Sequence, residues 1–121
     1  MAAKRVTSML LVDDVAATVA RFEQQGMQAF ASDEPECVGL MAEATRTGLM
    51  VLGAGYAARS IPPGAVAELR KGAGLYIWVD SLDEIVPSGV VLGEVETDYG
   101  TRERYVREDG GLVAYAEQLG H

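Results

Sequence analysis

The sequence predicts an α+β fold built from two tandem βαβββ units. Three observations support this prediction. Strand-like apolar segments and one amphipathic helix follow in the same order in both halves of the chain. The segment LVDDVAATV at 11–19 matches WVDSLDEIV at 78–86 with an offset of 67, and TGLMVLG at 47–53 matches GGLVAYA at 110–116 with an offset of 63. The 121 residues, 49% of them hydrophobic and 23% charged, are about one globular domain's worth, so a single domain over 1–121 is expected.

The first unit is expected to span about 5–53. Residues 5–12 (RVTSMLLV) are mainly apolar and predict a strand. Asp14 is expected to cap a helix in which Val15, Val19 and Phe22 share one face. The expected elements are a strand at 5–12, a helix at 14–25, strands at 28–32, 38–44 and 49–53, and a hairpin turn at Thr47-Gly48.

A connector over 54–73 separates the two units. Pro63 suits the first position of a short helix and Gly72 suits its end. The second unit, about 74–118, repeats the plan of the first with a shortened helix. Its expected elements are a strand at 75–79, a helix at 80–86 stopped by Pro87, strands at 90–97, 102–107 and 112–118, and a turn at 108–111.

Charge and residue counts exclude several functions. Ten basic against 18 acidic residues give a net charge of −8, which disfavours nucleic acid and attracts cationic small molecules or basic partners. The alternative to an attraction for cationic partners is that the acidic residues only keep the protein soluble. One cysteine excludes an intrachain disulfide, and no apolar run has the roughly 18 residues of a membrane span. Since the N-terminus also lacks the apolar region of a signal peptide, we expect a cytoplasmic protein that binds neither nucleic acid nor membrane.

The C-terminal segment YGTRERYVREDGGLVAYAE at 99–117 carries a family resemblance. Its aromatic-Gly-x-Arg-Glu start, its Asp-Gly turn and its closing strand, together with the tandem order of elements, resemble the vicinal oxygen chelate superfamily. That superfamily contains glyoxalase I, extradiol dioxygenases, fosfomycin-resistance enzymes and bleomycin-resistance proteins. The turn here, Glu108-Asp109-Gly110-Gly111, lacks the proline typical of the family. The resemblance implies curved mixed sheets that form a cleft, and a homodimer.

The resemblance also implies where a metal would be held, on the first and last strand of each unit. Those positions fall at Thr7, Val51, Gly74 and Ala114. None offers the carboxylate, imidazole or thiolate donors that such sites use. The sole histidine, His121, is the last residue of the sequence. We therefore expect no metal and no cofactor, which places the chain closest to the metal-free bleomycin-resistance-like branch.

The candidate site residues are ligand-binding, and none is expected to be catalytic. Tyr76 and Trp78 alternate with the aliphatic residues of their strand, which predicts that both rings face the cleft. Arg102 and Glu103 should point to opposite faces, so one of them enters the cleft, and the sequence leaves open which. Cys37 lies among acidic residues and is not expected to be a nucleophile. The full candidate set is Met9, Leu11, Val51, Tyr76, Trp78, Tyr99, Arg102, Glu103, Tyr105 and Ala114.

The sequence favours a metal-free binding protein for a small aromatic natural product or drug, with or without a cationic group. Such a protein would confer antibiotic resistance by sequestration or act as a carrier in biosynthesis. The alternative is an enzyme of the lyase, isomerase or dioxygenase type with a noncanonical or absent metal site. A third option is an interaction domain that has lost the cleft. The sequence does not name the ligand.

Overall fold

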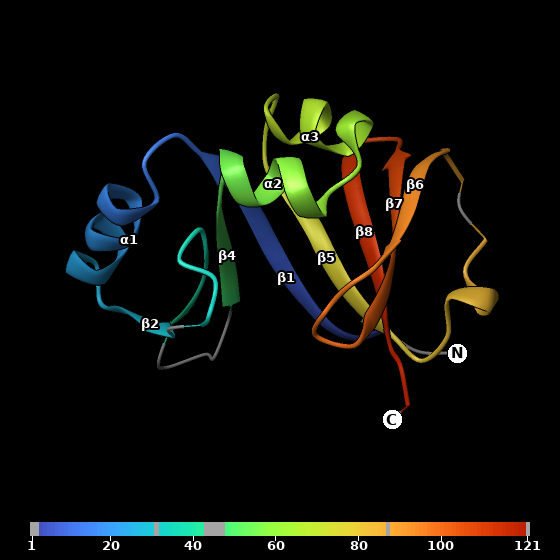
Figure 1. Ribbon diagram of the computed structural model, residues 1–121, viewed down its shortest axis with the longest axis horizontal. Helices are drawn as coiled ribbons and strands as arrows, with labels where there is room; N and C mark the ends of the chain where they lie inside the picture. The colour runs from blue at the N-terminus through green and yellow to red at the C-terminus, as the bar shows by residue number, and fades with distance from the viewer. Residues whose placement is uncertain (1–2, 31, 43–47, 87, 121) are drawn as a thin grey trace.

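The computed structural model describes residues 3–30, 32–42, 48–86 and 88–120. These residues form one eight-stranded sheet with strand order β2-β3-β4-β1-β5-β8-β7-β6, together with three α-helices and one 3-10 helix (Figure 1). The elements are β1 (Ala3–Val12), α1 (Val15–Gln24), β2 (Met27–Phe30), β3 (Cys37–Ala42), β4 (Gly48–Gly53), α2 (Ala54–Ser60), α3 (Pro63–Leu69), β5 (Gly74–Val79), η1 (Leu82–Glu84), β6 (Val90–Glu96), β7 (Thr101–Glu108) and β8 (Gly111–Gln118). The predicted α+β class and the repeated order of strands are confirmed.

Both halves of the sheet have the same pairing plan. In the first half β4 runs parallel to β1, and in the second half β8 runs parallel to β5, while the remaining pairs within each half are antiparallel. β1 and β5 pair antiparallel at the centre and join the two halves. A single continuous sheet therefore carries both repeats.

The strand register confirms one repeat offset and corrects the other. In the pairing of β1 with β5, Thr7 lies opposite Tyr76 and Met9 lies opposite Gly74. An offset of 67 relates Thr7 to Gly74 and Met9 to Tyr76, so the two pairs are equivalent under the repeat. Met9 pairs with Met50, whereas Tyr76 pairs with Ala114. Met50 is therefore the counterpart of Ala114, at an offset of 64 rather than 63. A shift of one residue turns a strand side chain to the other face of the sheet, so the assignment of Val51 to the cleft is wrong.

The helix at the start of the chain forms as predicted. The Asp14 side chain accepts a hydrogen bond from the Ala17 N–H at 2.9 Å and caps α1. The turn after α1 contains Gly26 at φ 95°, a conformation that glycine adopts without strain. α1 packs against β2, β3 and β4.

The connector contains two helices where one was predicted. α3 begins at Pro63 as expected. α2 starts after Gly53, which has no side chain to cap it, and the missing acceptor comes from Glu36, whose carboxylate accepts the Tyr56 N–H at 3.0 Å. A Cβ atom at Gly53 or Gly55 would lie too close to this carboxylate, so the Glu36 side chain would have to shift from its capping position.

The second unit departs furthest from the prediction. Within the predicted helix 80–86 only η1 forms, capped by the Ser81 hydroxyl, which accepts the Asp83 N–H at 3.2 Å. Ile85 is extended and ends the 3-10 helix, and so short a segment cannot offset the cost of helix nucleation. Pro87, the end of the predicted strand 38–44 and Thr47 of the predicted turn lie outside the described residues.

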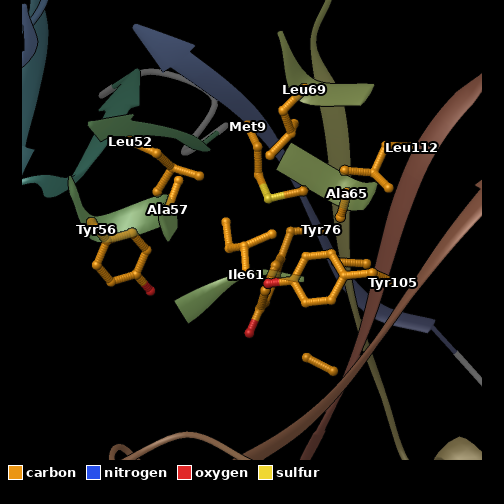
Figure 2. Close-up of a cluster of buried hydrophobic side chains, with 12 residues drawn as sticks. Met9, Leu52, Tyr56, Ala57, Ile61, Ala65, Leu69, Tyr76, Tyr105 and Leu112 are labelled. Carbon is orange, nitrogen blue, oxygen red and sulfur yellow. The ribbon is translucent and has the colours of Figure 1, made fainter. Parts of the chain in front are cut away.

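α2 and α3 cover one face of the sheet, which we call the inner face. Figure 2 shows the core between them, where Met9 and Tyr76 meet Ala57 and Leu69 from the helices. Each of these four side chains is at most 3% exposed. Because the helices cover only part of the inner face, the rest of that face is free to form a cleft. No helix in the described part of the chain has the length and apolar character needed to cross a bilayer.

Candidate ligand-binding cleft

A cleft of about 1140 Å³ lies on the inner face beside α2. Small-molecule sites commonly enclose roughly 300–1,000 Å³, so the space suffices for a multi-ring ligand. Four aromatic residues that carry a hydrogen-bond donor line it: Tyr56 from α2, Tyr76 and Trp78 from β5, and Tyr99 from the segment between β6 and β7.

The single tryptophan, Trp78, contacts the side chains of Tyr76 and Arg5. The Tyr76 and Trp78 ring centroids are 5.5 Å apart with an interplanar angle of 69°, an edge-to-face contact. The Arg5 guanidinium carbon also lies over the Trp78 ring, 5.6 Å from the centroid. All three residues line the cleft, so the aromatic wall carries a positive charge at one end.

Beside the cleft lies a buried carboxylate. Glu103 is 1% exposed, and the described residues contribute no ion pair to it. Its Oε2 accepts hydrogen bonds from the hydroxyls of Tyr76, of Tyr99 at 2.9 Å and of Thr101 at 3.0 Å. Its Oε1 accepts the Tyr105 hydroxyl at 2.8 Å. Four hydroxyl donors therefore satisfy the carboxylate, which has about four acceptor sites.

Burial raises the pKa of Tyr76, Tyr99 and Tyr105, and the neighbouring Glu103 charge raises each of these pKa values further. Burial also raises the pKa of Tyr56 to about 12. The phenols consequently remain protonated hydrogen-bond donors across neutral pH.

One member of this hydroxyl network reaches solvent. Tyr99 is 54% exposed, and its hydroxyl also lies 3.5 Å from that of Tyr56. Tyr99 therefore connects the buried carboxylate with the open cleft. Cys37 lines the same wall, and burial raises the pKa of its thiol. A thiol in this state is a poor nucleophile.

Acidic groups outnumber basic groups around the cleft. Asp33, Glu34, Glu96 and Asp98 line it, against Arg5 and Arg59. Arg59 donates to Glu34 at 3.1 Å and to the Gly55 carbonyl at 3.1 Å, so its charge is already paired. The surplus of carboxylates favours a ligand with a positive charge.

The structure separates the predicted site residues into three groups. Tyr76, Trp78 and Tyr99 line the cleft, and Glu103 and Tyr105 form the network beside it. Met9, Leu11 and Ala114 lie on the inner face but pack in the core beneath the helices. Val51 and Arg102 lie on the outer face, because their strand neighbours Met50, Leu52, Thr101 and Glu103 point inward.

Of Arg102 and Glu103, Glu103 points to the inner face, where it lies in the network beside the cleft and does not itself line the cleft. Arg102 instead forms ion pairs with Asp83 at 3.3 Å and Glu117 at 3.7 Å on the other side of the sheet. Among the residues of the site that were not predicted are Arg5, Tyr56 and Thr101. Arg5 shares its face with Thr7 and could have been found by strand alternation, whereas Tyr56 belongs to α2, a helix that was not predicted.

The residues at the expected metal positions do not suit a metal. With the corrected register these are Thr7, Met50, Gly74 and Ala114. A Cβ atom at Gly74 would lie 2.9 Å from Leu69 and 3.3 Å from Met9, so apolar side chains fill the space that a ligating side chain there would need. Within the described ranges no three His, Cys, Asp or Glu side chains gather in a way that could hold a metal ion.

Neither a protein-family model nor a curated protein matches this sequence. Solved structures do match it. The protein BH1468 from Bacillus halodurans C-125 aligns with a TM-score of 0.65 and 14% identity over 98% of both chains. Methylmalonyl-CoA epimerase from Mycobacterium tuberculosis aligns with a TM-score of 0.59 and 12% identity over 94% of this chain and 87% of the other.

A glyoxalase/bleomycin resistance protein/dioxygenase superfamily member from Vibrio splendidus 12B01 aligns with a TM-score of 0.57 and 16% identity, covering 94% of this chain and 98% of the other. At such identities the likeness concerns the fold. Together with the two βαβββ pairing plans, it shows that this chain has the vicinal oxygen chelate fold of the glyoxalase/bleomycin resistance protein/dioxygenase superfamily.

Proposed function

We propose that the chain is a metal-free binding protein for a small planar aromatic molecule with a cationic group, which it sequesters or carries. The observation that supports this most is the combination, in one cleft, of the Trp78 and Tyr76 rings with a surplus of carboxylates. Aromatic walls stack a planar ligand, and the carboxylates attract its charge.

The Glu103 network gives such a ligand a defined polar contact. Glu103 is fully hydrogen-bonded, so a ligand does not reach it directly. Tyr99 lines the cleft, donates its hydrogen to Glu103 and keeps lone pairs on its hydroxyl oxygen. A ligand ammonium or ring N–H donates to this oxygen, and the negative charge behind it strengthens the bond.

Replacing Trp78 tests the binding function. 9-Aminoacridine, a planar cation at neutral pH, serves as the probe, and binding is measured by calorimetry in the presence of EDTA. Trp78→Ala should weaken binding about tenfold or more, because one stacked ring contributes roughly 1–3 kcal/mol. Trp78→Phe, which keeps a ring, should retain most of the affinity.

The outcomes of this experiment differ clearly. A Trp78→Ala variant that folds and binds the probe as tightly as the wild type contradicts the proposal. If Trp78→Ala unfolds, Trp78→Leu, which keeps bulk without a ring, replaces it, and a Leu variant that folds and binds the probe as tightly as the wild type also contradicts the proposal. Loss of probe binding on adding EDTA to the wild-type protein contradicts a metal-free site.

A second candidate function is an enzyme of the lyase or isomerase type that works without the superfamily's metal donors. The Tyr99–Glu103 pair favours it, because a cleft-facing phenol bonded to a carboxylate at 2.9 Å can relay a proton to or from a substrate. A compound found by thermal-shift screening of natural products would be incubated with the protein in D₂O. Deuterium uptake or a mass change that Tyr99→Phe abolishes favours the enzyme, and unchanged recovery favours the binding protein.

A further inference from the structure

Four residues form a row across the inner face of the sheet. Arg5 on β1 pairs with Trp78 on β5, Trp78 pairs with Ala116 on β8, and Ala116 pairs with Glu103 on β7. Neighbouring strands are about 4.8 Å apart, so roughly 14 Å separates the backbones of Arg5 and Glu103. The row thus has a cation at one end, a carboxylate at the other and an aromatic ring between them.

Arg5 differs from the other basic groups in this region. Arg59 is paired with Glu34, and Lys4 is paired with Asp80 at 2.9 Å. No ion pair within the described ranges involves Arg5, although the chain carries a net charge of −8. An exposed guanidinium that lines a cleft and has no acidic partner there is available to an anionic group of a ligand.

The contact with Trp78 is compatible with that role. The guanidinium lies over the ring, and its N–H groups lie in its own plane and point outward from its edge. A carboxylate can accept two parallel hydrogen bonds at this edge while the contact between Arg5 and Trp78 persists. Trp78 therefore positions Arg5 and also forms part of the cleft wall.

We infer that the cleft selects an amphoteric planar aromatic ligand, whose carboxylate binds Arg5 and whose cationic group lies toward Tyr99 and the acidic rim. This inference rests on the proposed function and adds to it an anionic group at a stated end of the ligand. The approximate length of the row suits a ligand of two or three fused rings with the opposite charges on opposite sides.

Three acridines with the same ring system test the inference: 9-aminoacridine, 9-aminoacridine-4-carboxylic acid and acridine-4-carboxylic acid. Each is titrated by calorimetry into the wild type, Arg5→Gln and Arg21→Gln. Arg21 is the matched control, because its guanidinium lies over the Phe22 ring at the same 5.6 Å but on α1, and neither residue lines the cleft. Circular dichroism confirms that each variant is folded.

The wild type and Arg21→Gln should bind the amphoteric compound about tenfold more tightly than 9-aminoacridine, since charge-assisted bidentate hydrogen bonds have this strength. Arg5→Gln should lose that preference, so that its affinities for the two amino compounds agree within about twofold.

Equal affinity of the wild type for both amino compounds, or a preference that survives in Arg5→Gln, would overturn the inference and leave the proposed function standing. If the wild type binds none of the three compounds, the proposed function fails and the inference fails with it.

Discussion

Glu103 is a buried carboxylate whose charge is stabilised by hydroxyl groups instead of a basic side chain. Moving a charge out of water is costly unless the charge is well hydrogen-bonded, and here Tyr76, Tyr99, Thr101 and Tyr105 supply the bonds. The same bonds fix the orientations of three phenol rings. One residue therefore sets the shape of the polar end of the cleft.

Glu103→Gln should lower the free energy of unfolding by about 1–3 kcal/mol. The amide is uncharged, so the charge-assisted hydrogen bonds become neutral ones, and one acceptor oxygen becomes a donor that faces a hydroxyl. Urea denaturation monitored by circular dichroism measures the loss.

Glu94→Gln is the matched control for this substitution. Glu94 is 42% exposed in its side chain and pairs with Arg104 at 2.7 Å. Arg104 is only 16% exposed, but it keeps its hydrogen bonds to the Leu82 and Ile85 carbonyls when Glu94 is replaced, so the control should lose at most about 1 kcal/mol. A loss in Glu103→Gln no larger than that in Glu94→Gln would show that the buried network does not stabilise the fold.

At the scale of the elements, α2 depends on a residue from another segment. Glu36 lies just before β3, and its carboxylate caps the helix by accepting the Tyr56 N–H. The negative charge also interacts favourably with the helix N-terminus. Since Tyr56 is part of the cleft wall, this cap links the segment between β2 and β3 to the shape of the site.

Glu36→Ala should destabilise the protein by about 1 kcal/mol, the usual cost of losing an N-terminal cap. Glu23→Ala removes a carboxylate at an exposed position of α1 and is the control. It should change the free energy of unfolding by no more than about 0.5 kcal/mol. Thermal and urea unfolding measure both variants. Equal stability of the two would mean that Glu36 does not hold α2 in place.

At the scale of the whole molecule, the sheet leaves surface that a second chain can cover. β2 and β6 are open edge strands in the strand order. η1 takes the place in the second unit that α1 has in the first, and Leu75 on β5 is 41% exposed. Phe30 at the edge strand β2 is 46% exposed. Open edges and exposed apolar side chains of this kind favour association.

We predict a homodimer on these grounds. Sedimentation velocity at micromolar concentration should give a species of twice the 12.9 kDa chain mass. Observation of the 12.9 kDa monomer alone across the micromolar range would contradict the prediction.

The sequence by itself determined the features that depend on local periodicity. Alternation along β5 placed Tyr76 and Trp78 on one face, and Asp14 followed by residues at helical spacing predicted α1 and its cap. The repeat of strand and helix patterns predicted the order of elements in both halves. Each of these signals lies within about ten neighbouring residues, where side-chain direction follows directly from the strand or helix period.

Only the tertiary structure decided the features that depend on pairing between distant segments. The register of β4 against β1 turned Met50 inward and Val51 outward, and a one-residue slip of this kind is invisible to a pattern of apolar residues. α2 was missed because its cap is twenty positions away in the sequence, at Glu36. Tyr76 and Tyr99 converge on one carboxylate from β5 and from the segment before β7, because long-range strand pairing brings those segments together.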